Sequence, residues 1–316
     1  MSLKEVAARF VLETLLPPIR VNEIPNASYA AGKTLESEGK WDKALQHFYT
    51  LALREGDPDL RGQSLVESAQ MCINYGRFGQ ARKYLTMAET VVSSQLGDDG
   101  EYLRARVWEK SAWIDDYEGN FAGSLEKLSS ARTALQKIPL NAWGDGEKSL
   151  ESTINHFSAR AHIGLAIKGE SKKENLANAR SYLERELSNN LPPDNRGFQF
   201  AWLARVALLE GNLSQAELYI TEAKKLWSEK SRGILAHYYL LEGALAMARG
   251  DPNLARRNFE QALNIRVVVE KYPKGEADAL MGIAATYWAE GQIGAAGMYA
   301  ARSVRTYPLV VFRGGM

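Results

Sequence analysis

Apolar residues gather into helix-like segments along this chain, and these segments recur in a fixed unit. Each unit has an apolar segment that ends at a glycine, an apolar residue two positions later, and a small residue three positions further on. The regular copies are Gly39–Ala44, Gly76–Ala81, Gly119–Ser124, Gly211–Ala216, Gly250–Ala255 and Gly291–Ala296, and an irregular copy spans Gly169–Ala179. A pattern repeated in this way predicts a series of helix pairs.

Each position of the unit has a physical role. The glycine ends the first helix, where a left-handed backbone turn is needed that glycine adopts most cheaply. The small residue after it lies in the second helix, where close packing on the first leaves room for little more than a methyl group. A matching small residue precedes six of the glycines by seven positions: Gly32, Ala69, Ala112, Ala204, Gly243 and Ala284. Asp57-Pro58 and Asp251-Pro252 predict N-caps with a proline in the first helical turn.

This pattern resembles the tetratricopeptide repeat (TPR), which has small residues near positions 8, 20 and 27 and a glycine at position 15. In four of the repeats the residue near position 27 is an alanine: Ala88, Ala131, Ala223 and Ala262. The resemblance implies an all-α fold, a right-handed α-α superhelix of about seven helix pairs preceded by an N-terminal helix. The glycines are 37 to 50 residues apart, whereas the usual repeat is about 34 residues. Such long units resemble the repeats of bacterial maltose-operon activators and of kinesin light chains.

The repeat pattern divides the chain into three parts. Residues 1–21 are expected to form an N-terminal helix and linker, and residues 22–308 the solenoid of about seven repeats. Residues 309–316 form an apolar tail that contains Leu309-Val-Val-Phe312. A terminal repeat normally needs a polar outer face, but the last helix is rich in small and apolar residues. We therefore expect the tail to fold back as a cap, or a homodimer or partner to dock on the C-terminal repeat.

Charge and composition narrow the class of partner. The chain of 316 residues has a formal net charge of +1, which lacks the basic excess of a nucleic-acid binder or a polybasic membrane-surface protein. No apolar run approaches the roughly 18 residues of a membrane span, and Glu5 and Arg9 interrupt the N-terminal segment where a signal peptide would be apolar. We expect a cytoplasmic protein that binds neither nucleic acid nor membrane.

The sequence offers no catalytic or cofactor motif. It has no phosphate-binding loop, dinucleotide fingerprint or zinc motif. His156 and His162 are six residues apart, so on a helix they point in different directions and cannot easily share a metal. The single cysteine, Cys72, falls at a core position of its repeat and is expected to be a buried, inert thiol. We expect no enzyme activity, no cofactor and no metal.

The TPR resemblance places the first helix of each repeat along a concave groove. The groove-facing positions of repeats one to three are polar and aromatic, whereas those of repeats five to seven are largely apolar. We therefore predict a partner-binding surface formed by Lys33, Asn74, Arg106, Lys110, Trp113 and Tyr117. Arg106 and Lys110 match in charge the third-repeat positions of the family's carboxylate clamp, but Tyr29, Lys33 and Glu67 depart from it. A solvated or core role for these residues is the alternative.

Two functions are compatible with these features. The favoured one is a non-catalytic adaptor that docks a segment of a protein or peptide partner in the groove. The other is a sensor in which a peptide or small ligand regulates a separate effector. A ligand that binds the folded state raises its stability, so thermal melting with metabolite pools distinguishes the two.

Overall fold

The computed structural model describes residues 21, 24–95, 97–189, 191–227, 232–270 and 273–307, with the backbone alone for 232–233, 268–270 and 273. Regular structure in these ranges is entirely helical. The chain divides into two compact units, Met1–Phe157 and Ser158–Met316, and the boundary falls inside one helix, α8. The described helices confirm the predicted all-α fold of paired helices.

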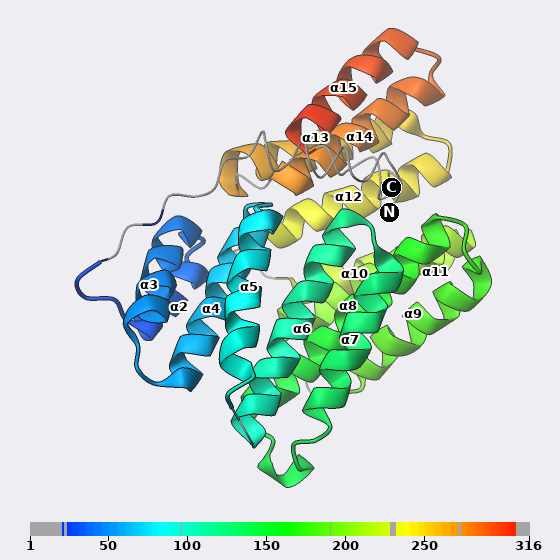
Figure 1. The fold of residues 1–316 in the computed structure, drawn as a ribbon. Coiled ribbons are helices and arrows are strands. Elements are labelled where there is room, and N and C mark those ends of the chain that lie inside the picture. Colours follow the sequence, from blue (N-terminus) through cyan, green and yellow to red (C-terminus); the bar gives the residue numbers. More distant parts are fainter. Residues whose placement is uncertain are drawn as a thin grey trace. The chain divides into compact units, whose positions relative to one another are not determined.

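The described residues of the first unit form three helix pairs and the beginning of a fourth (Figure 1). Its elements are α2 (Tyr29–Ser37), α3 (Trp41–Arg54), α4 (Pro58–Asn74), α5 (Phe78–Val92), α6 (Asp98–Glu118), α7 (Phe121–Leu135), the short helix η1 (Leu140–Ala142) and α8 (Asp145–Ile167). Each helix packs against the next in the α2–α7 series, and α4 also packs against α6. First helices of successive repeats are therefore neighbours, as a solenoid requires.

The second unit continues the same pairing from the C-terminal part of α8. Its further elements are α9 (Lys172–Leu187), α10 (Pro193–Glu210), α11 (Leu213–Leu226), α12 (Arg232–Ala248), α13 (Pro252–Asn264), the π-helix η2 (Ile265–Glu270), α14 (Pro273–Ala289) and α15 (Ile293–Thr306). Apolar side chains of α8, α9 and α10 share one core cluster, and those of α12, α13 and α14 share another. The apolar core of this unit is thus divided into clusters that follow one another along the series of helix pairs.

The repeat glycines have the predicted backbone conformation. All seven have a positive φ, between 70° and 84°: Gly39, Gly76, Gly119, Gly169, Gly211, Gly250 and Gly291. Six are followed within two residues by the start of the second helix, and Gly169 by α9 three residues later. The predicted caps are confirmed as well, since Asp57 and Asp251 accept hydrogen bonds from the amides of Asp59 and Leu254.

Two repeats use glycine where others use alanine, and the reason is a phenylalanine on the second helix. A Cβ atom at Gly32 would lie 2.6 Å from the ring of Phe48, and one at Gly243 would lie 2.4 Å from the ring of Phe259. Both distances are below any normal carbon contact. The equivalent positions of repeats two and three pair Ala69 with Leu85 and Ala112 with Leu128, all buried. The size of one side chain therefore matches the space left by its partner.

Some predicted parts lie outside the described residues. These are almost all of the N-terminal helix and linker (1–21) and the whole tail (309–316). The division into 1–21, 22–308 and 309–316 stays a prediction.

Candidate functional site

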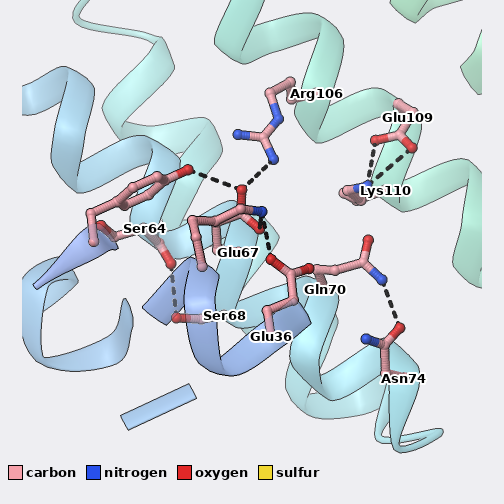
Figure 2. A network of polar contacts seen from close by, with 11 residues as sticks. Glu36, Ser64, Glu67, Ser68, Gln70, Asn74, Arg106, Glu109 and Lys110 are labelled. Atoms are coloured by element: carbon pink, nitrogen blue, oxygen red, sulfur yellow. Dashed lines mark hydrogen bonds and ion pairs between the residues drawn. The ribbon is translucent and has the colours of Figure 1, made fainter. Parts of the chain in front are cut away.

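The carboxylate of Glu67 joins three successive first helices in the first unit. Tyr29 of α2 donates a hydrogen bond from its hydroxyl to Oε1 over 3.0 Å, and Arg106 of α6 donates from Nη2 to the same oxygen over 2.8 Å. Lys33 of α2 places Nζ 3.4 Å from Oε2 and also pairs with Glu36. Figure 2 shows Arg106 pointing toward Glu67 from the neighbouring helix. Polar groups of α2, α4 and α6 thereby form one connected face.

This network is largely withdrawn from water, which strengthens its electrostatics. The side chain of Glu67 is 4% exposed and that of Arg106 is 13% exposed. Burial alone would raise the pKa of Glu67, but Arg106, Lys33 and Lys110 outweigh it and hold the pKa at about 2. Burial opposes the charge of Arg106, yet Glu67 raises its pKa above the usual range. Both groups are therefore ionised at neutral pH.

A second ion pair lies one turn further along α6. The Nζ of Lys110 is 3.1 Å from each carboxylate oxygen of Glu109, whose side chain is buried. The same Nζ lies 3.8 Å from the centre of the Trp113 ring, a cation–π contact. Trp113 in turn stacks on Phe157 of α8, with ring centres 4.2 Å apart. Burial raises the pKa of Glu109, and the charge of Lys110 opposes this shift.

Asn74 and Tyr117 lie near the C-terminal ends of α4 and α6 and belong to neither ion pair. Asn74 accepts a hydrogen bond from Nε2 of Gln70 over 2.8 Å. Tyr117 stacks on Phe78, the first residue of α5, with ring centres 5.9 Å apart. Among the buried polar atoms of α4 and α6, Nε1 of Trp113 and Oε1 of Gln70 make no hydrogen bond within the described part of the chain.

The structure therefore groups the six predicted residues in part. Lys33 and Arg106 meet through Glu67, and Lys110 meets Trp113, while Asn74 and Tyr117 are placed separately. Their role in binding a partner stays a prediction. Sequence reasoning missed Glu67 as the centre of the network and treated it only as a departure from the carboxylate clamp. The sequence held one indication of this role. Glu67 is an acidic residue on the first helix of repeat two, and the first helices of repeats one and three carry the basic residues Lys33 and Arg106.

Other reactive groups offer little chemistry in the residues described. No cluster of three or more His, Cys, Asp or Glu side chains among them is arranged to hold a metal ion. Cys72 is fully buried, as predicted, and burial raises the pKa of its thiol to about 12. None of the described helices combines the length and apolar content that crossing a membrane demands.

Comparisons with known proteins give limited information. No protein-family model and no curated protein matches the chain. Among solved structures, it is similar to the C-terminal part of a TPR repeat-containing protein from Cytophaga hutchinsonii, with a TM-score of 0.39 and 13% sequence identity, over 89% of this chain and 96% of that one. The assignment of the fold therefore rests on the helices of the chain itself.

Proposed function

We propose that this protein is a non-catalytic scaffold that binds a segment of a protein or peptide partner along the first helices of its repeats. The observation that carries the proposal is the connected polar face of α2, α4 and α6, built from three successive repeats. The exposed edge of this face, which includes Lys33, Asn74 and Tyr117, offers contact points to an extended segment. The long repeats, which resemble those of maltose-operon activators and kinesin light chains, agree with it.

The exposed parts of this face supply the contacts that we propose. The side chain of Lys33 is 46% exposed, although it pairs with Glu36 and Glu67, and Asn74 and Tyr117 are partly exposed. Arg106 and Lys110 are held by internal carboxylates, so a partner's carboxylate would have to compete with Glu67 for Arg106. We therefore propose that Lys33, Asn74 and Tyr117 contact the partner directly, and that Arg106, Lys110 and Trp113 position this face.

Affinity capture from lysate of the source cells tests this proposal. We expect the double substitution Lys33→Ala and Asn74→Ala to reduce recovery of specific partners several-fold, measured by quantitative mass spectrometry. Neither change leaves Glu67 unpaired, because Arg106 remains, so the thermal melt should be nearly unchanged. The matched control is Lys83→Ala with Thr86→Ala, which alters two exposed residues of the second helix α5.

Two outcomes would contradict the scaffold. One is equal loss of capture in both double variants, which would mean that α5 matters as much as the first helices. The other is a small metabolite that raises the melting temperature of the wild type while no protein is captured. That result would favour the sensor.

The C-terminal pair presents a further surface that we assign to self-association. Ile293 and Met298 of α15 are each about two-thirds exposed, and Trp288 of α14 is similarly exposed. Burying such side chains contributes about 1.5–3 kcal/mol each. We infer that a second copy of the chain covers this face.

Sedimentation of the purified protein tests this assignment. We expect the wild type to sediment as a dimer at high concentration, and the double substitution Ile293→Gln and Met298→Gln to sediment as a monomer. Leu218→Gln with Leu254→Gln, which removes two exposed leucines from other helices, should remain dimeric. A wild-type monomer at high concentration would exclude the dimer, and a dimer formed only after deletion of residues 309–316 would identify the tail as a cap.

A further inference from the structure

Two positions recur wherever the second helix of one repeat packs against the first helix of the next. The first position directly follows the small residue of the second helix, and the other directly precedes the glycine that ends the next first helix. In the described part of the chain, four such junctions carry an ion pair between these positions: Arg82–Glu118, Arg180–Glu210, Glu217–Arg249 and Arg256–Glu290. Repeats one and three have Leu45 and Leu125 at the first position, and these carry no charge.

Each ion pair links two successive repeats. Helix α5 packs on α6, α9 on α10, α11 on α12 and α13 on α14. The paired residues are 30 to 36 residues apart in the sequence. The side chains of Arg82, Glu118, Arg256 and Glu290 are largely buried, which gives these pairs more weight than exposed ones.

The junction between repeats five (α10, α11) and six (α12, α13) has the opposite polarity to the others. Three junctions place the arginine on the second helix and the glutamate on the next first helix. Here Glu217 lies on α11, and Arg249 directly follows α12. Nη1 of Arg249 donates to Oε1 of Glu217 over 3.2 Å, and Nη2 donates to Oε2 over 2.7 Å. Two parallel hydrogen bonds make this a strong form of the pair, and they lower the pKa of Glu217.

The reversed polarity matters because the repeats present similar faces to one another. A second helix can therefore receive the first helix of a wrong repeat, and such misassembly is a characteristic failure of repeat proteins. If repeat five were skipped, α12 would pack on α9 and Arg249 would face Arg180. If repeat six were skipped, α14 would pack on α11 and Glu290 would face Glu217. Both errors bring like charges together, which destabilises the contact.

With one polarity at every junction, the same two errors would bring opposite charges together. A glutamate at position 249 would face Arg180, and an arginine at position 217 would face Glu290. The native pairs would be equally good in that arrangement, so the reversal adds nothing to the attraction within the correct fold. Its effect is confined to the incorrect arrangements.

We propose that the reversed pair Glu217–Arg249 determines the order in which the helices of the second unit associate, by excluding arrangements in which a repeat is skipped. Specificity of this kind comes from repulsion in the wrong complex as much as from attraction in the right one. The inference concerns the assembly of the chain, and it does not depend on the proposed scaffold function.

The charge swap Glu217→Arg with Arg249→Glu tests the proposal, because it keeps an opposite-charge pair at the native junction and removes the reversal. We expect the same urea midpoint as for the wild type. After dilution from urea at low protein concentration, misassembled chains should be about fivefold more abundant, since the facing charges of a skipped arrangement then attract instead of repel. Limited proteolysis at fixed refolding times measures the fraction of native, resistant chains.

The single reversals Glu217→Arg and Arg249→Glu test whether the two residues interact. Each places like charges at the native junction and should lower the ratio of folded to unfolded chains about fivefold, because an attraction is replaced by a repulsion of similar size. The double swap should restore that ratio. A double swap no more stable than the single reversals would overturn the proposal.

The matched control is Glu276→Arg with Arg302→Glu, which swaps an ion pair between α14 and α15 of a single repeat. Neither its urea midpoint nor its refolding should differ from those of the wild type, because no junction between repeats is altered. Equal losses of native chains in the two swapped proteins would overturn the proposal. Refolding of the Glu217 and Arg249 swap with wild-type yield would overturn it as well.

Discussion

Replacing Arg106 with methionine is expected to lower the free energy of unfolding by about 3 kcal/mol. Removing one partner of a buried ion pair typically costs about 3–5 kcal/mol, because the other charge stays buried without compensation. Glu67 would keep Lys33, whose Nζ lies 3.4 Å away, so we expect the lower end of that range. Urea denaturation followed by far-UV circular dichroism measures the effect.

The double substitution Arg106→Met and Glu67→Met should recover most of this loss. Both charges are then gone, and apolar side chains of similar volume fill the space, which is often neutral or stabilising. The control is Arg104→Met, because Arg104 lies on the same helix and pairs with Glu101 near the surface; we expect a change below about 0.5 kcal/mol. Equal losses for Arg106→Met and Arg104→Met would show that the Glu67 network contributes no stability.

The same network predicts a dependence of stability on pH. The pKa of Glu67 is about 2 in the folded protein, against 4.5 for an ordinary glutamate. Because the folded value is the lower one, the contribution of Glu67 is complete above about pH 4.5 and is lost as the pH falls toward 2. The double methionine variant should lose less stability over this interval than the wild type. An identical acid dependence of the two proteins would contradict the assignment.

Replacing Phe259 with alanine is expected to destabilise the second unit by about 3–5 kcal/mol, the usual cost of deleting a buried phenylalanine. Phe259 is 1% exposed, and its ring fills the space beside Gly243 and Gly282. Denaturant unfolding measures the change. Leu218→Ala, at an exposed position of α11 in the same unit, is the control and should change stability by less than about 0.5 kcal/mol.

A paired substitution tests whether glycine is required by the phenylalanine ring. Gly243→Ala alone should destabilise, because its Cβ would lie 2.4 Å from that ring, and overpacking costs about 1–3 kcal/mol. In a Phe259→Leu background the same change should cost much less, since it recreates the alanine–leucine pair of repeats two and three. Equal costs in both backgrounds would show that the two positions do not interact.

The Glu67 network also bears on the proposed binding of a partner by the first unit. The TPR resemblance assigns the position of Arg106 to a partner's carboxylate, but in this protein Glu67 provides the carboxylate from within. An acidic group of a partner would therefore have to compete with Glu67 for Arg106.

The sequence alone determined the helices and their ends. A glycine that must adopt a positive φ, an Asp-Pro pair at a helix start and a small residue at a close contact are local requirements, so each is visible in a single stretch of chain. Seven glycines, from Gly39 to Gly291, have the backbone conformation that their positions predicted. Cys72 likewise lies in the core where the repeat register placed it.

The tertiary structure sets which charges neutralise one another. Glu67 and Arg106 are 39 residues apart, and Arg180 of α9 and Glu210 of α10, which form another ion pair, are 30 residues apart. The repeat register shows that such residues face the same side, but it does not give the separation of their side chains. A difference of a few ångströms in the separation of two side chains decides whether a charge is bound internally or is available to a partner. Both the Coulomb energy and the cost of burial change steeply over that distance. Those separations come from the packing of whole helices, which no local stretch of sequence specifies.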